Sequence, residues 1–342
     1  MGSVSEVTLH ARRFTAPLLV ALATVVALMA PTPPAAAAAP PYVALGDSYS
    51  SGTGTRSYIN DGTSCQRSVY AYPSLLASQK GYALNFRACS GARIADVTNT
   101  QLSALSSSTR YVTISVGGND AGFADVLTEC ALPGWASNCN GAINTAQAFI
   151  NTTLPGRLST LYASIRSRAP QARVVVVGYP RIFNGEDCNA LTWFSPDEES
   201  RLNATADLLN AKLSAAASAR GFGFANPTSR FIGHAVCDSP EWINGLSNPI
   251  SESYHPKVAG HSSGYAPTVS PLLTGAPARI TSRTLADARA AAGRYAAQQR
   301  RYADLDASIE PETFRAPDLT SPAVRRAARA HGIDLDRWLA RQ

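Results

Sequence analysis

Short, continuous runs of apolar residues alternate along the chain with longer stretches that have a helical pattern. The apolar runs are rich in Val, Ile, Leu and aromatic residues, and most of them are followed by Gly, Asn or Pro. Continuous runs of this kind are typical of strands that are buried on both faces of a parallel sheet. They predict strands at 42–45, 83–87, 111–116, 173–177 and 221–225.

Helical patterns lie between these runs. The stretch 72–79 is one helix candidate, and 144–168 is a longer one that Pro155 can interrupt. Ser195, Pro196 and Glu198 have the residue types of a helix start, with a serine N-cap, proline in the first turn and glutamate three residues after the cap. Alternating strands and helices over residues 40–274 predict a single three-layer α/β/α domain.

The first 39 residues predict a secretory signal peptide. Arg12 and Arg13 precede an apolar run at 16–30, which is followed by prolines and by an alanine stretch at 35–39. A basic segment, an apolar segment and small residues follow one another in this order in signal peptides. We expect cleavage near Ala38 or Ala39 and a secreted mature chain. An uncleaved membrane anchor is the alternative, although the run is shorter than the ~20 residues of a membrane span.

Residues 275–342 form a C-terminal extension that is rich in Ala and Arg. Its patterns predict helices at 285–302 and 323–331, the second ending at Gly332. We expect a small helical or partly disordered appendage to the domain. A role in binding a partner or the cell envelope is the alternative.

The formal net charge of +6 does not indicate a nucleic-acid-binding domain. The extension holds 12 Arg against 8 acidic residues, whereas residues 40–274 hold 16 basic and 15 acidic residues. Nucleic-acid binding needs a concentrated basic surface, which a nearly neutral domain lacks. The sequence also has no P-loop and no His, Asp or Glu cluster for a metal, so we expect no cofactor.

The cysteines favour disulfide bonds over a zinc site. An even number of cysteines in an exported chain is typical of disulfides, but six cysteines allow 15 pairings, which the spacing alone does not resolve. There is no Cys-x-x-Cys pair, which a zinc ribbon would need. The six are Cys65, Cys89, Cys130, Cys139, Cys188 and Cys237.

Polar residues suited to acyl transfer follow the predicted strands. Ser48 follows the first strand, Gly91 the second and Asn119 the third, and His255 lies near the end of the domain. Ligands bind beyond the carboxyl ends of the strands in open parallel sheets. A serine nucleophile needs a base, and the oxyanion of the tetrahedral intermediate needs amide donors. The sequence therefore predicts an ester-hydrolysing site at this edge.

These motifs resemble the SGNH/GDSL hydrolase family over residues 42–271. The matching blocks read Gly-Asp-Ser-Tyr-Ser-Ser-Gly at 46–52, Gly91, Gly-Gly-Asn-Asp at 117–120 and His255-Pro256. The chain is most similar to the secreted actinomycete lipases, esterases and phospholipases of that family. The resemblance implies a flavodoxin-like parallel sheet in the α/β/α fold. It also implies the pairs Cys65–Cys89, Cys130–Cys139 and Cys188–Cys237.

The resemblance also implies a role for each site residue. Ser48 would be the nucleophile and His255 the general base. The Ser48 amide, the Gly91 amide and the Asn119 side chain would form the oxyanion hole. The family usually has aspartate three residues before the histidine, and here that position is Glu252. Either Glu252 or the backbone carbonyl of Ser253 would then orient the imidazole.

The sequence leaves other assignments open. His234 and His261 compete with His255 for the role of base. An α/β-hydrolase would need Gly-x-Ser-x-Gly in mid-chain, and Ser50 stands where the last glycine should be. A secreted binding module that has lost catalysis is the non-enzyme alternative.

We expect hydrolysis through an acyl-serine intermediate, with a lipid ester favoured as the substrate and a short-chain or carbohydrate ester as the alternative. We expect a monomer that makes transient contact with a lipid surface. Apolar residues available for an acyl groove are Phe123, Leu127, Leu132, Trp135, Trp193 and Phe194. With the ordinary histidine pKa of ~6.5, activity is expected to rise between roughly pH 6 and 8.

Overall fold

The computed structural model describes residues 1–6, 8–11, 38–311 and 314–341. Contacts divide the chain into Met1–Ala38 and Ala39–Gln342, and the second unit carries the fold described below. The predicted signal peptide lies largely outside the described residues, including Arg12, Arg13 and the apolar run at 16–30. Within the described ranges, no helix is long and apolar enough to cross a membrane.

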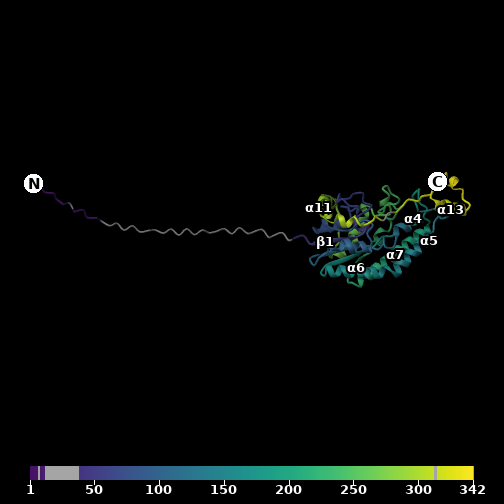
Figure 1. The fold of residues 1–342 in the computed structure, drawn as a ribbon, viewed down its shortest axis with the longest axis horizontal. Helices are drawn as coiled ribbons and strands as arrows, with labels where there is room; N and C mark the ends of the chain where they lie inside the picture. The colour runs from purple at the N-terminus through teal and green to yellow at the C-terminus, as the bar shows by residue number, and fades with distance from the viewer. Residues whose placement is uncertain (7, 12–37, 312–313, 342) are drawn as a thin grey trace. The chain divides into compact units, whose positions relative to one another are not determined.

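A five-stranded parallel sheet forms the centre of the domain (Figure 1). Its order is β2-β1-β3-β4-β5, the flavodoxin-like order, and every neighbouring pair is parallel. The α/β prediction is therefore confirmed. The strands are β1 (Pro41–Gly46), β2 (Ala83–Phe86), β3 (Tyr111–Ser115), β4 (Arg173–Val177) and β5 (Gly223–Ala225).

The fifth strand is shorter than the apolar run predicts. Gly221 has a φ of +64° and closes the turn after the preceding helix, where its amide donates to the Ser218 carbonyl. The Phe222 amide likewise donates to the Ala217 carbonyl of that helix. Both amides are used by the helix end, so the ladder begins only at Gly223.

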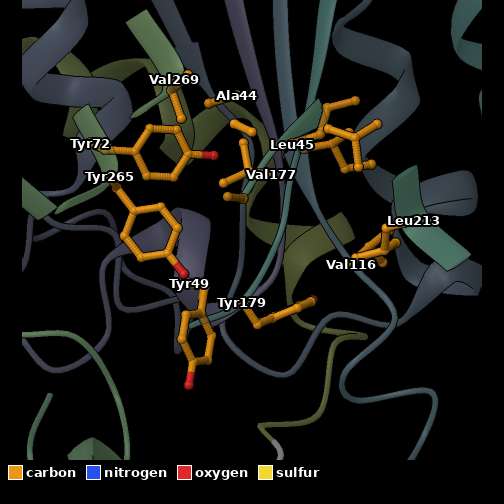
Figure 2. Packing of buried hydrophobic residues seen from close by; sticks show 14 of the residues in the cluster. Ala44, Leu45, Tyr49, Tyr72, Val116, Val177, Tyr179, Leu213, Tyr265 and Val269 are labelled. Atoms are coloured by element: carbon orange, nitrogen blue, oxygen red, sulfur yellow. The ribbon is translucent and has the colours of Figure 1, made fainter. Parts of the chain in front are cut away.

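Helices cover both faces of the sheet. Helices α2 (Tyr72–Lys80) and α9 (Ala266–Thr274) pack together on one face, and α6 (Leu154–Arg168) and α7 (Pro196–Ser218) pack together on the other. Figure 2 shows Tyr72, Tyr265 and Val269 on one side of the strands and Leu213 on the opposite side. All four side chains are fully buried. This is the three-layer arrangement that the alternating pattern predicts.

The stretch predicted as one long helix is two helices. Helix α5 (Cys139–Thr152) ends just before Thr153, and α6 begins just after it, with Pro155 in its first turn. Proline is tolerated in a first turn because its missing N–H has no partner there in any case. Helix α7 begins as predicted, because the Ser195 hydroxyl accepts from the Glu198 amide and the Glu198 carboxylate accepts from the Ser195 amide.

Shorter elements connect these layers and carry the site. They are the α-helices α1 (Ser48–Ser51), α3 (Ile94–Asp96), α4 (Phe123–Cys130) and α8 (Thr228–Phe231), the π-helices Val97–Gln101 and Gly260–Tyr265, and the 3₁₀ turns Leu102–Ala104 and Ile250–Glu252. Three disulfides join Cys65 to Cys89, Cys130 to Cys139 and Cys188 to Cys237. This is the pairing that the family resemblance implies.

The C-terminal extension packs against the domain. Its first part contacts α2 and β2, and its last part contacts the loop closed by Cys130 and Cys139. In Figure 1 its yellow ribbon runs from α11 across to α13. Its elements are α10 (Ser282–Ala290), α11 (Ala292–Gln299), a 3₁₀ turn (Arg300–Tyr302), α12 (Ala303–Asp306), α13 (Pro322–Ala330) and α14 (Leu335–Leu339).

An ion-pair cluster joins the extension to the sheet. The Asp306 carboxylate lies 2.5 Å from Arg67 Nη2 and 2.6 Å from Arg87 Nη2, and all three side chains are fully buried. Asp61 is the second carboxylate on Arg67, at 2.7 Å. Burial lowers the pKa of the Arg87 guanidinium, and the Asp306 carboxylate opposes this shift.

Replacing Asp306 by Ala should therefore strongly destabilise the fold. The change leaves two buried guanidinium groups with one carboxylate fewer, which costs about 3–5 kcal/mol in buried pairs. Asp304→Ala in the same helix is the matched control, because Asp304 is exposed. Urea unfolding of both variants measures the difference. A loss below 1 kcal/mol for Asp306→Ala would contradict the inferred contribution of the cluster.

Candidate active site

Ser48 lies at the start of α1, directly after the carboxyl end of β1. Gly46 makes this tight turn with a φ of +120°, and a Cβ there would lie 2.2 Å from the Ser115 carbonyl oxygen. Only glycine fits such a close approach. The Asp47 amide donates to the same carbonyl at 3.0 Å. The ends of β1 and β3 are thus joined immediately beside Ser48.

The Asp47 side chain stabilises the turn that presents Ser48. Its carboxylate accepts hydrogen bonds from the Tyr49 amide (3.0 Å), the Ser115 hydroxyl (2.6 Å) and the Tyr179 hydroxyl (2.5 Å). Burial raises the pKa of Asp47 to about 6, although the bonds from Ser115 and Tyr179 lower it. Tyr179 was not singled out from the sequence; its only signal was its place just after the fourth strand.

His255 contacts Ser48 directly. Its Nε2 lies 2.8 Å from the Ser48 Oγ, and its Nδ1 lies 2.9 Å from the Ser253 carbonyl oxygen. Because a carbonyl only accepts hydrogen bonds, Nδ1 carries the proton and Nε2 accepts from the serine hydroxyl. Burial lowers the pKa of His255 to about 4, and the bond to the Ser253 carbonyl partly opposes this shift. The imidazole is therefore neutral at neutral pH.

Backbone contacts hold the His255 loop in place. The Asn244 side-chain amide donates to the Gly54 and His255 carbonyls, at 3.0 and 2.9 Å. The Tyr49 hydroxyl donates to the Tyr254 carbonyl at 2.8 Å. Gly54 has a φ of +94°, and a Cβ there would lie 2.8 Å from the His255 Cβ. The segment after Ser48 thus fits closely against the histidine loop.

The Glu252 carboxylate binds elsewhere. It accepts a hydrogen bond from the Tyr58 hydroxyl at 2.6 Å and pairs with Arg56 Nε at 3.0 Å. Two groups were expected as partners of the His255 Nδ1, and the Ser253 carbonyl is the one that contacts it in the structure. The Glu252 carboxylate contacts Tyr58 and Arg56 instead. A glutamate in place of the family's usual aspartate is one methylene longer, and here it extends to the 56–58 loop.

The three groups predicted to form the oxyanion hole each have an N–H that is available for a further hydrogen bond. The Ser48 and Gly91 amides have no hydrogen-bond acceptor among the described residues. Asn119 Nδ2 donates to the Ala92 carbonyl at 3.0 Å, which leaves its second hydrogen available. Gly91 has a φ of +85°. Ser48 and Asn119 line one cavity with His255, whereas Gly91 lines a different hollow.

An apolar cavity extends from Ser48 and His255. Its volume, taken as the space open to the centre of a water molecule, is about 60 Å³. Of the six residues expected to line an acyl groove, Phe123 and Leu127 do so. Leu132, Trp135 and Trp193 instead contact the extension, and Phe194 packs against Phe183 and Tyr254. The other apolar walls are Ala121, Ala124, Ile150, Pro180, Ile182, Ala206, Leu209 and Phe314.

The competing histidines make other contacts. His234 stacks on Trp242 with ring centroids 3.7 Å apart. His261 is buried, and its Nδ1 accepts from the Tyr72 amide at 3.3 Å. In the described ranges no three His, Cys, Asp or Glu side chains come together as a metal site. The serine, the neutral imidazole and the apolar cavity are together typical of a serine ester hydrolase.

Comparison with known proteins agrees with this class. Residues 44–262 match the model of the GDSL-like Lipase/Acylhydrolase family. Lipase 1 of Streptomyces coelicolor is 46% identical over 236 residues, which cover 68% of this chain and 87% of that protein. The chain belongs to the GDSL-like lipase/acylhydrolase family and is a carboxylic ester hydrolase.

Two solved structures share the fold of the domain. The extracellular lipase from Streptomyces rimosus superposes with a TM-score of 0.65 at 43% identity, covering 68% of this chain and 100% of that chain. Phospholipase A1 from Streptomyces albidoflavus superposes with a TM-score of 0.65 at 44% identity, covering 68% and 99%. Both solved chains are thus matched almost over their whole length.

Glu252→Gln should leave kcat within about fivefold of the parent. Glutamine can still accept from the Tyr58 hydroxyl, and Glu252 does not contact the imidazole. Replacing a triad acid by its amide lowers kcat by about 10⁴ in a serine protease. Steady-state hydrolysis of a p-nitrophenyl ester distinguishes the two cases, with a thermal melt as the control for folding. A loss of 10³ or more in a folded variant would restore Glu252 as the orienting acid.

The midpoint of the His255 titration should lie near pH 4 rather than near the ordinary value of ~6.5. The loss of kcat/KM in acid should therefore occur at a lower pH than an ordinary histidine would give. As the pH falls, the His255 imidazole is protonated in the unfolded chain before it is protonated in the folded chain. Its contribution therefore lowers the free energy of unfolding between about pH 6.5 and about pH 4. NMR titration of the His255 ring proton measures this midpoint separately from Asp47. A midpoint at or above 6.5 would contradict the effect of burial.

Proposed function

We propose that the chain is a secreted serine hydrolase of lipid esters that works through an acyl-serine intermediate. The observation that carries the proposal is the contact of Ser48 Oγ with His255 Nε2, at 2.8 Å, beside an apolar cavity. Nucleophile and base within hydrogen-bond reach, with the base oriented by a third group, are the signature of covalent catalysis. Here the third group is the Ser253 carbonyl.

In the first step, Ser48 Oγ attacks the acyl carbonyl carbon while His255 Nε2 takes the hydroxyl proton. The resulting imidazolium gives that proton to the leaving alcohol, and the acyl-enzyme forms. In the second step, His255 removes a proton from water, which attacks the acyl carbonyl. Return of the proton to Ser48 releases the carboxylic acid. A neutral His255 before each attack is required, and the low pKa of the buried imidazole supports this.

Charge on the tetrahedral intermediate would be stabilised by the amides of Ser48 and Gly91 and by the Asn119 side chain. Donors fixed before the reaction need no reorganisation as the charge develops. The Ser48 amide lies in the first turn of α1, where helix amides lack partners within the helix. The bond from Asn119 to the Ala92 carbonyl links this side chain to the segment that carries Gly91.

The wall of the cavity favours a fatty acyl chain over a sugar. Beyond the catalytic groups, the lining residues are mostly aliphatic and aromatic. A sugar ester would need convergent hydrogen-bond partners for its hydroxyl groups, because unpaired polar groups are costly to bury. The relatives named as a lipase and a phospholipase A1 support the same substrate class.

Export is the second part of the proposal. The relative from Streptomyces rimosus is described as an extracellular lipase, and three disulfides form readily in an oxidising compartment. The basic and apolar segments near the N-terminus support a cleaved signal peptide. A monomer in transient contact with a lipid surface remains our expectation for the mature chain.

Ser48→Ala should lower kcat at least roughly 10³-fold, because it removes the hydroxyl that contacts His255 Nε2. The measurement is hydrolysis of p-nitrophenyl esters with two to sixteen acyl carbons by the full mature chain. Ser107→Ala, a change of an exposed serine before β3, is the matched control.

Turnover that is best on long acyl chains and depends on Ser48 is the expected outcome. Turnover confined to acetate and butyrate would favour the short-chain or carbohydrate esterase. Equal rates for the parent and Ser48→Ala would overturn the mechanism. Binding of the folded Ser48→Ala protein to cell-wall or lipid particles, without ester turnover by the parent, would favour the binding module.

A further inference from the structure

A residue of the C-terminal extension lines the cavity that holds Ser48 and His255. The family match ends at residue 262, and the extension begins at 275. Phe314 nevertheless lines the same cavity as the nucleophile and the base, with a side chain that is 4% exposed. The extension thus supplies a wall of the substrate site that the family domain does not encode.

Phe314 packs against the histidine loop and lines the same cavity as α4. Its ring meets the Tyr254 ring edge to face, with centroids 4.9 Å apart, and Tyr254 directly precedes His255. Phe123 and Leu127 of α4 line the same cavity as Phe314. An aromatic ring in this place presents a flat apolar surface to whatever occupies the cavity.

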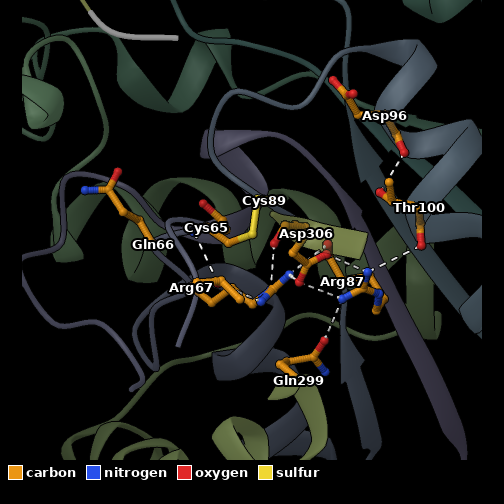
Figure 3. The surroundings of a disulfide bond; sticks show 12 residues. Cys65, Gln66, Arg67, Arg87, Cys89, Asp96, Thr100, Gln299 and Asp306 are labelled. Carbon is orange, nitrogen blue, oxygen red and sulfur yellow. Dashed lines mark hydrogen bonds and ion pairs between the residues drawn. A yellow bond between two sulfur atoms is a disulfide. The ribbon is translucent and has the colours of Figure 1, made fainter. Parts of the chain in front are cut away.

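Asp306 and Ile309 of the extension are attached to the domain beside the segment that carries Gly91. Asp306 pairs with Arg67 and Arg87, as Figure 3 shows beside the Cys65–Cys89 disulfide. Ile309 packs against that disulfide and against Ala92. The Ala92 carbonyl is the acceptor for Asn119, so this part of the extension lies next to the proposed oxyanion donors.

The chain after Phe314 is fixed to α4 and to the loop beyond it. The Arg315 amide donates to the Thr128 hydroxyl at 3.0 Å, and the Arg315 guanidinium pairs with Asp125 at 2.7 Å. Farther on, Val324 of α13 is buried against Leu132 and Trp135. Phe314 therefore lies between two attached segments, which hold its ring at the cavity.

We propose that Phe314 is a specificity-determining residue that sets the acyl-chain preference of this enzyme. The inference rests on the proposed function, because it takes the apolar cavity as the site of the acyl group. The ring occupies volume that a longer or bulkier acyl chain would need, and it covers a shorter chain that fits. Discrimination between homologous chains in apolar pockets depends on such contacts, at roughly 10-fold or more per methylene group.

Two substitutions of opposite size test this role. Phe314→Ala enlarges the cavity and should raise the ratio of kcat/KM for dodecanoyl over butanoyl p-nitrophenyl esters about tenfold. Phe314→Trp reduces the cavity and should lower the same ratio. The full mature chain is used in both cases, and thermal melts check that each variant is folded. If Phe314→Ala does not fold, Phe314→Leu takes its place, with a smaller rise expected.

Val324→Ala is the matched control for a loosened extension. Val324 is buried in α13 and does not line the cavity. Two results together support the inference. Val324→Ala keeps the acyl-chain preference of the parent, and the two Phe314 variants shift that preference in opposite directions. A shift in Val324→Ala as large as that in Phe314→Ala would overturn it, because loosening alone would then explain the change.

Unchanged or parallel profiles in folded Phe314→Ala and Phe314→Trp would also overturn it. These outcomes differ from failure of the proposed function, in which the parent chain has no turnover or keeps its rate after Ser48→Ala. The two hypotheses are therefore separated by the same set of ester substrates.

Discussion

The hydrogen bond between Ser48 and His255 joins groups that are 207 residues apart, and the rest of the site depends on it. Neither partner lies on a long element. Ser48 begins a four-residue helix, and His255 lies in the loop between a 3₁₀ turn and a π-helix. Their alignment therefore comes from contacts between loops, which Asn244 and the Tyr49 hydroxyl provide through backbone carbonyls. Because the acceptors are backbone carbonyls, these contacts fix the backbone of the histidine loop directly.

The group that accepts the hydrogen bond from His255 Nδ1 affects the pKa of the imidazole. A carbonyl dipole orients Nδ1–H as a carboxylate would, but it stabilises an imidazolium less, since it carries no net charge. Burial then dominates, and the pKa of His255 falls to about 4. In the proposed mechanism, the neutral base is thereby available over a wide pH range, while the transient imidazolium would be stabilised mainly by the charge that develops on the substrate. The Glu252 carboxylate is bound to Arg56 and Tyr58 and makes no hydrogen bond with the imidazole among the described contacts, so we expect it to support the loop.

Local sequence patterns sufficed for the sheet and for the residues that follow its strands. A run of apolar residues indicates a buried strand, and a glycine after it indicates a turn. Ser48 and Asn119 could therefore be identified because they follow predicted strands. The orienting partner could not be found, because a backbone carbonyl leaves no signal in the residue type. Tyr179 and Phe314 were missed for a related reason, since an aromatic residue after a strand or in a tail has the same pattern as an ordinary core residue. Only tertiary contacts place both in the cavity.

The buried arginines connect the extension to the chemistry. Arg67 and Arg87 come from the domain itself, next to the disulfide that precedes Gly91, and a buried guanidinium needs a carboxylate close by. Asp61 forms an ion pair with Arg67, whereas Asp306 forms ion pairs with both Arg67 and Arg87. A domain that ended at residue 274 would therefore retain two internal cations with one carboxylate between them. The extension supplies the missing charge and, eight residues later, the ring that lines the cavity. The same segment thus contacts the loop that carries Gly91 and lines the space beside Ser48, so the proposed role of Phe314 predicts that stability and substrate preference are coupled.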